Sequence, residues 1–157
     1  MQKSVISTVR EAKTQVPGEW LDLEQLARVE VTSEDADFPV EAVFAFGTGS
    51  GWRAAGGGRQ TIRLIFREPQ PIHRIHLEFS ETELTRLQEF TLRWAAAQDG
   101  SFKEIVRQQW NFSPQGATSE TEDYQVDLAG VSVLELTLNP DLSGGTAVAS
   151  LVKWRVA

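Results

Sequence analysis

The feature that most constrains this chain is a run of alternating apolar and polar residues between Gln60 and Trp110. Three stretches of this run keep their apolar residues in a single phase: Ile62, Leu64 and Phe66; Ile75, Leu77 and Phe79; and Phe90, Leu92, Trp94 and Ala96. A period of two is typical of strands that bury one face and expose the other. The pattern therefore predicts half-buried antiparallel β-strands.

Related patterns predict strands over the rest of the chain. We expect strands near 27–32, 60–67, 72–80, 88–97, 102–110, 122–128, 131–138 and 147–156. Pro69 and Pro71 are expected to separate the second strand from the third, and Asp99-Gly100-Ser101 forms a turn. About eight short strands without a long helix favour an all-β fold, an antiparallel two-sheet sandwich of the jelly-roll type.

The length of 157 residues fits one domain with a full core. We expect residues 1–16 to form a tail or a loosely docked helix and residues 17–157 to form a single β-sandwich. The chain has no cysteine, which excludes disulfides and thiolate metal sites. Its first ten residues lack the apolar core of a secretory signal, and no apolar run reaches the roughly 18 residues that span a bilayer. The expected location is cytoplasmic, with no membrane span.

The net charge of −7 disfavours nonspecific binding to nucleic acid, because contacts to phosphates need a basic surface. Four arginines lie off the apolar phases of their strands and could line up across a sheet: Arg63, Arg67, Arg74 and Arg93. The simpler interpretation is an ordinary solvated sheet face.

Several short motifs follow one another in a familiar order. They are Val31-Thr32-Ser33, Ala42-Val43-Phe44, Gly51-Trp52, Ile62–Phe66, Pro71–Ile75, Phe90–Trp94 with Asp99–Phe102, and Ala149–Trp154. In this order the chain resembles the galactose-binding-like, or discoidin (coagulation factor 5/8 type C), family of jelly-roll domains. The resemblance covers about residues 20–157. It implies a non-catalytic module that binds glycans, lipids or proteins, often with a structural calcium ion.

Two tryptophans with polar neighbours are the candidate ligand-binding residues. Trp52 is followed by Arg53 in a glycine-rich loop, and Trp110 is followed by Asn111 at the end of a predicted strand. Sugars offer apolar faces for stacking and hydroxyls for hydrogen bonds, so these pairs suit a carbohydrate. The alternative is structural, with Trp52 folded onto the core and Trp110 closing the end of the sandwich.

An acidic loop is the candidate metal site. Glu34, Asp35 and Asp37 lie close together, and Ca²⁺ binds several oxygen ligands from carboxylates and backbone carbonyls. The resemblance places calcium in about the same region. A solvated loop is the alternative. His73 and His76 are three apart on a predicted strand, which puts them on opposite faces and disfavours zinc.

Taken together, these features favour a non-catalytic module that binds carbohydrate through loops at one end of the sandwich. The alternative is a protein–protein interaction module that uses a sheet face or the same loops. An enzyme is the least favoured hypothesis. It would be a glycosidase-like hydrolase that uses carboxylates such as Glu120, Glu122 and Asp123.

Overall fold

The computed structural model describes residues 20–46 and 49–157, so the expected tail or helix at 1–16 lies outside the described residues. Two short helices are present, α1 (Leu23–Leu26) and the 3₁₀ helix η1 (Val40–Val43). The remaining elements are strands: β1 (Ala27–Val31), β2 (Trp52–Gly57), β3 (Gln60–Ser80), β4 (Arg86–Ala95), β5 (Lys103–Phe112), β6 (Ser119–Asn139), β7 (Val148–Leu151) and β8 (Lys153–Val156).

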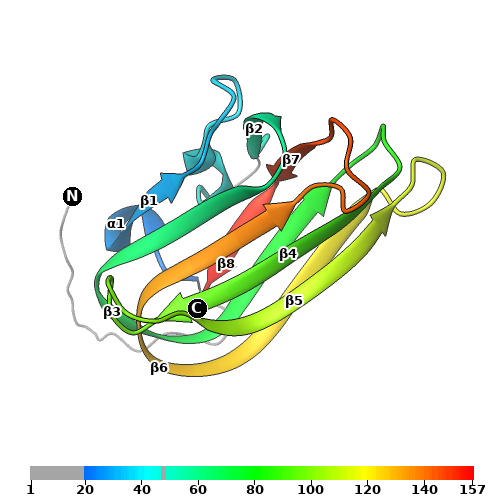
Figure 1. The fold of residues 1–157 in the computed structure, drawn as a ribbon. Coiled ribbons are helices and arrows are strands. Elements are labelled where there is room, and N and C mark those ends of the chain that lie inside the picture. The colour runs from blue at the N-terminus through cyan, green and yellow to red at the C-terminus, as the bar shows by residue number, and fades with distance from the viewer. Residues whose placement is uncertain (1–19, 47–48) are drawn as a thin grey trace.

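Two long strands, β3 and β6, organise the fold. Each has 21 residues, and they pair antiparallel from Gln60↔Leu138 to Ser80↔Ser119. Both strands bend back in the middle, so the same pair takes part in both layers (Figure 1). The first half of β3 also pairs with β1, and its second half pairs with β8. The sandwich is thus a β3–β6 ribbon folded over on itself.

The sequence-based separation of residues 60–67 from 72–80, and of 122–128 from 131–138, is wrong in one respect. Each pair of predicted strands belongs to one continuous strand. The prolines lie where the pairing register of β3 with β6 is irregular, between Ile65 and Ile72. Proline has no N–H to donate, so it is tolerated at this bend, where the ladder is already interrupted.

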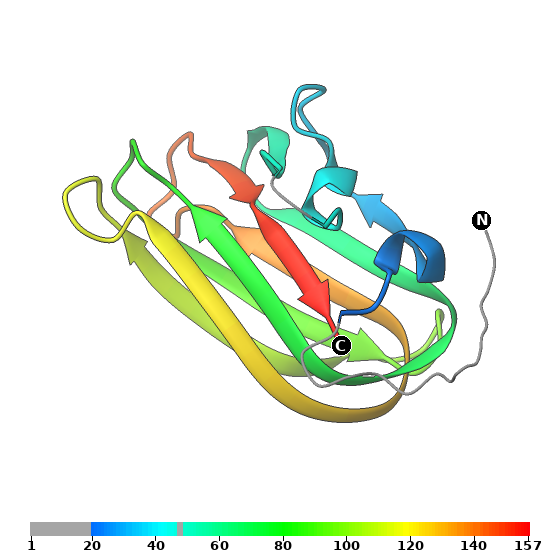
Figure 2. The same ribbon diagram turned by 180° about the vertical axis from the view of Figure 1, so that it is seen from behind.

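The other strands complete the two layers. In one layer the order is β1-β3-β6-β4-β5, and in the other β8 adds to the second half of β3. Strands β2 and β7 form a short ribbon near one end of the sandwich, where the loops gather (Figure 2). This arrangement confirms the predicted all-β, two-sheet sandwich with about eight strands.

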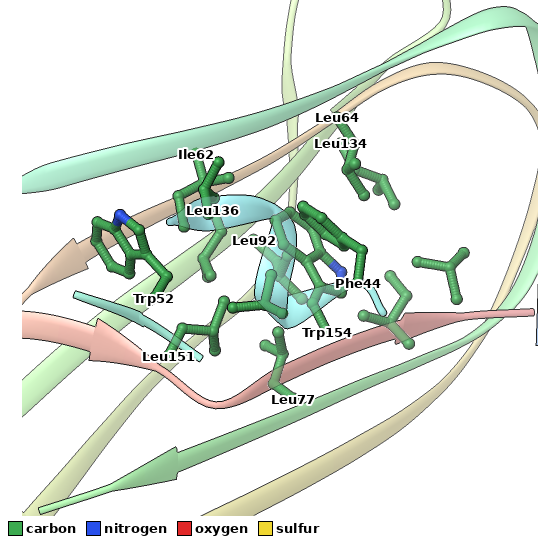
Figure 3. Close-up of a cluster of buried hydrophobic side chains, with 14 of the residues drawn as sticks. Phe44, Trp52, Ile62, Leu64, Leu77, Leu92, Leu134, Leu136, Leu151 and Trp154 are labelled. Carbon is green, nitrogen blue, oxygen red and sulfur yellow. The ribbon is translucent and has the colours of Figure 1, made fainter. Parts of the chain in front are cut away.

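The core lies between the layers and contains most of the predicted apolar phases. Ile62, Leu64, Leu77 and Leu92 are at most 1% exposed, and they belong to the same core cluster as Trp154 (Figure 3). Ala96 is exposed, because β4 ends at Ala95 and the alternation ends with it. The alternating pattern therefore identified the buried face of each strand correctly, except at the end of β4.

The four arginines do not form one basic patch. Arg63 and Arg93 both bond to Glu135 on the outer face of one layer, whereas Arg74 pairs with Asp123 on the other layer. The interpretation as a solvated, charge-balanced sheet face thus holds for these three residues. The described residues, 20–46 and 49–157, include no helix of the length and apolarity needed to cross a bilayer.

Candidate functional site

A cleft of about 520 Å³ opens at the loop end of the sandwich. One wall comes from the β2–β7 ribbon and the residues on either side of it. The facing wall is the β3–β4 connection, from Ser80 to Leu84, and Phe38 contributes from the segment before η1. Segments from four parts of the chain therefore meet at this end.

Arg53 is the basic side chain of this cleft. Its Cζ atom lies 4.8 Å from the centre of the Phe38 ring, a cation–π distance. The backbones of these two residues are also joined, because Arg53 N donates to Phe38 O at 3.2 Å. Within residues 20–46 and 49–157, no ion pair holds the exposed guanidinium group. Arg53 therefore retains donors for a ligand.

The facing wall has a defined shape because of Glu81. Its Oε2 atom accepts hydrogen bonds from the backbone N–H groups of Glu83 (3.1 Å) and Leu84 (3.2 Å). Its Oε1 atom accepts from Arg86 Nε at 2.8 Å. Partial burial favours a higher pKa for Glu81, but the bonds from Arg86 and the backbone outweigh it and lower the pKa. Leu84 projects from this wall and is 48% exposed.

The β2 side of the cleft depends on a glycine. Gly51 has a φ of 80°, and a Cβ atom at this position would lie 2.9 Å from Val152 Cα. The close approach lets β2 pair with β7 through Trp52↔Leu151 and Arg53↔Ser150. Since neighbouring strand residues point to opposite faces, one of Trp52 and Arg53 must point inward and the other outward.

The inward residue is Trp52, which was predicted as a stacking platform and is almost wholly buried. It is 1% exposed and packs beside Ile62, Leu136 and Leu151 (Figure 3). Its indole N–H donates to Ser33 O at 3.0 Å. Trp52 belongs to the core and forms part of the cleft lining with little of its surface exposed.

The second predicted pair lies elsewhere. Trp110 and Asn111 are on β5, at the far edge of the larger layer, and neither lines the cleft. Trp110 is partly buried against the core, and Asn111 is exposed opposite Leu87. Of the four predicted ligand-binding residues, Trp52 and Arg53 line the cleft, and of these two Arg53 is the exposed one. Phe38 and Leu84 were missed, although an exposed leucine in the polar segment Glu81–Thr85 was a possible signal.

The carboxylates of the acidic loop make local hydrogen bonds. Glu34 Oε1 accepts a hydrogen bond from Val40 N, and Asp35 Oδ1 accepts one from Asp37 N, both at 2.9 Å. These carboxylates fold the loop locally. In the part of the chain that the structure describes, no group of three or more His, Cys, Asp or Glu side chains is placed to hold a metal ion.

The predicted carboxylates lie on both faces of β6, with Glu122 beside Glu120. Glu120 is 1% exposed and points into the sandwich, whereas Asp123 is on the outer face with Arg74 and His76. Burial, followed by the proximity of Glu122, raises the pKa of Glu120 to about 9. A carboxyl group this deeply buried has no access to a glycosidic bond.

No family model and no curated protein matches this sequence, but solved structures match its fold. The family 32 carbohydrate-binding module of Clostridium perfringens NanJ, solved with galactose, superposes with a TM-score of 0.62 at 12% identity, covering 83% of this chain and 92% of the module. Another Clostridium perfringens family 32 module, solved with GlcNAc-α-1,4-galactose, gives 0.65 at 10% identity, covering 92% and 98%. A chitosan-binding module from a Paenibacillus sp. IK-5 chitosanase/glucanase gives 0.59 at 14% identity, covering 87% and 98%.

These similarities extend over most of this chain and nearly the full length of each module. Identities of this size show a shared fold. The protein thus has the galactose-binding-like jelly-roll fold of the family 32 carbohydrate-binding modules, as its resemblance to the discoidin family implied.

Proposed function

We propose that the protein is a non-catalytic carbohydrate-binding module whose ligand lies in the cleft at the loop end. The observation that carries this proposal is the Arg53–Phe38 pair on the cleft rim, in a fold shared with modules solved with bound sugars. Arg53 donates hydrogen bonds to sugar hydroxyls, and Leu84 on the facing wall contacts apolar sugar faces.

The cleft walls support a binding role rather than catalysis. Two carboxylates line the cleft, Glu81 and Glu83. The pKa of Glu81 is lowered, and both of its oxygens already accept hydrogen bonds. A glycosidase acid needs a raised pKa and a free proton to donate. Glu120 has the raised pKa but lies in the interior, away from the cleft.

A glycan array followed by calorimetric titration tests the proposal. The array includes galactose, GlcNAc-α-1,4-galactose and chitosan oligomers. For a sugar that binds, we expect Arg53→Ala and Phe38→Ala each to weaken affinity roughly tenfold or more. Arg107→Ala is the matched control, because this exposed arginine lies on β5 outside the cleft. No binding at millimolar sugar, or equal affinity in all four proteins, would contradict the proposal.

A second candidate function is protein binding at the same end. Its specific support is that Leu84 and Leu142, on two loops that meet near Leu87, are 48% and 38% exposed. This function predicts binding to a protein partner that Leu84→Ser weakens and Arg53→Ala leaves unchanged. Carbohydrate binding predicts the stronger effect at Arg53.

A further inference from the structure

Buried polar side chains connect the wall of the cleft with the interior of the sandwich. Arg86, which bonds to Glu81 in the wall, also donates from Nη1 to Gln88 Oε1 at 3.3 Å. Gln88 in turn donates from Nε2 to Glu120 Oε1 at 3.1 Å. Arg86, Gln88 and Glu120 are 3%, 0% and 1% exposed. The cleft wall is therefore linked, through two intervening side chains, to a carboxyl group in the core.

This region also collects polar atoms that have no partner. Among the described residues, five buried side-chain polar atoms lack a hydrogen bond, and four of them belong to Arg86, Trp110, Glu120 and Tyr124. Two of these atoms are complementary, since Arg86 Nη2 is a donor and Glu120 Oε2 is an acceptor when ionised. Unpartnered buried polar atoms are rare. The region therefore contains the donor and the acceptor for a second hydrogen-bond pattern that the structure does not use.

The charges determine which pattern forms. With Glu120 neutral, Arg86 is balanced by Glu81, the nearest ionised carboxylate. The other titratable groups around Glu120 and Arg86 are Glu122, whose side chain hydrogen-bonds to Glu120 and helps to raise its pKa, Tyr124 on β6 and Asp141 on the β6–β7 connection. Gln88, Trp110, Phe112 and Phe79, which also line this region, carry no charge. An ionised Glu120 would face Arg86 as its only cation among these groups.

We propose that Glu120 regulates the cleft: when Glu120 ionises, its carboxylate attracts the Arg86 guanidinium through the unpartnered Nη2, and this pull displaces the Nε contact by which Arg86 fixes Glu81 in the cleft wall. In the neutral state, Arg86 holds Glu81, and Glu81 holds the backbone of Glu83 and Leu84. In the ionised state, Arg86 moves toward Glu120 against its bond to Pro140 O, and Glu81 shifts together with the backbone that it holds. The proton released by Glu120 goes to solvent. Arg86 is thus a positioning residue for the wall, and the effect on sugar affinity rests on the proposed function.

Backbone NMR measures this coupling without any ligand. We expect the amide signals of Glu83 and Leu84 to shift as Glu120 loses its proton, with a midpoint near pH 9. Glu120→Gln keeps an oxygen acceptor for Gln88 but cannot ionise, so these shifts should disappear. Glu104→Gln, on the opposite, outer face of the sandwich, is the control and should keep them. Circular dichroism confirms that each protein stays folded over the pH range.

A second measurement needs only the wild-type protein. The side-chain carboxyl ¹³C signal of Glu120 reports its ionisation directly, and its midpoint should coincide with that of the Leu84 amide. Different midpoints, or the same amide shifts in Glu120→Gln, would overturn the inference. This comparison remains decisive if Glu120→Gln does not fold.

Titration with galactose then relates the wall to binding. We expect affinity to fall roughly tenfold between pH 7 and pH 10 in the wild type and in Glu104→Gln, and to stay level in Glu120→Gln. Equal losses in all three proteins would contradict control by Glu120. If galactose binds at no pH, galactose is not a ligand of this cleft, and the amide shifts alone decide whether Glu120 controls the wall.

Discussion

Glu135 accepts a hydrogen bond from Arg63 Nε at 2.7 Å on the outer face of the larger layer. A second arginine, Arg93, bonds to the other carboxylate oxygen. Glu135 is 1% exposed, whereas the arginine side chains are 45% and 41% exposed. These residues belong to a row of cross-strand neighbours. Glu30 on β1 lies opposite Arg63, and Glu104 on β5 lies opposite Arg93, so the charges alternate across five strands. The buried carboxylate at the centre joins three neighbouring strands.

We expect Glu135→Ala to lower the free energy of unfolding by roughly 1–3 kcal/mol, because it removes charge-assisted hydrogen bonds to two arginines. Urea denaturation measures the change. Glu104→Ala, at the exposed end of the same row, should change stability by less than about 0.5 kcal/mol. Equal effects of the two substitutions would show that burial of the central carboxylate is unimportant.

Trp52→Ala should destabilise the fold rather than affect binding alone. The substitution leaves a cavity next to Ile62 and Leu151 and removes the bond to Ser33 O, so we expect a loss of roughly 3–5 kcal/mol. Denaturation monitored by circular dichroism measures it. Trp110→Ala, at a partly buried position on an edge strand, is the comparison and should cost less. A Trp52→Ala protein with wild-type stability would contradict the burial of this indole.

The stability of the protein should fall as pH rises. Glu120 has an ordinary pKa of 4.5 when unfolded and a pKa of about 9 when folded. Between these values the folded state binds a proton that the unfolded state does not, so the contribution of Glu120 is complete below the lower value and is lost as pH approaches the upper one. Glu120→Gln should remove the part of the decrease in unfolding free energy with pH that comes from Glu120. It should also raise the unfolding free energy at pH 8 by roughly 1 kcal/mol or more. Denaturant titrations from pH 5 to pH 10 measure how the unfolding free energies of the wild type and of Glu120→Gln depend on pH. The same pH dependence in both proteins would contradict the prediction.

Calcium should leave the melting temperature unchanged. The carboxylates of Glu34 and Asp35 are engaged by backbone N–H groups, and a ligand stabilises a protein only if it binds the folded state preferentially. Thermal melts with millimolar calcium and with a chelator compare the two conditions. A higher melting temperature in calcium would show that these carboxylates rearrange around a metal ion.

The sequence predicted the layers well because alternation is a local property of each strand. Leu64, Leu77 and Leu92 could be assigned to the core from their immediate neighbours. Trp52 could not, because its burial depends on pairing with Leu151, far away in the sequence. Arg53 was identified together with Trp52, but its position in the cleft also requires Phe38 from a third segment.

The hydrogen-bond chain from Glu81 to Glu120 could not be predicted from the sequence either, because it also depends on residues that are far apart in the chain. Its members lie on a loop, on β4 and on β6, and no spacing in the sequence relates them. The short bond between Arg86 and Glu81 forms within a local turn, but the burial that sets the state of Glu120 is created only when the second layer covers it. Local pattern therefore predicted the scaffold, and long-range packing determined the site.

The bends of β3 and β6 give the two ends of the molecule different mechanical roles. At one end, the continuous strands β3 and β6 each pass from one layer to the other. The covalent backbone therefore holds the two layers together at this end. At the opposite end the layers are connected only by loops, and the cleft lies among these loops (Figure 1). Sequence changes in these loops can therefore reshape the cleft without altering how the layers are joined.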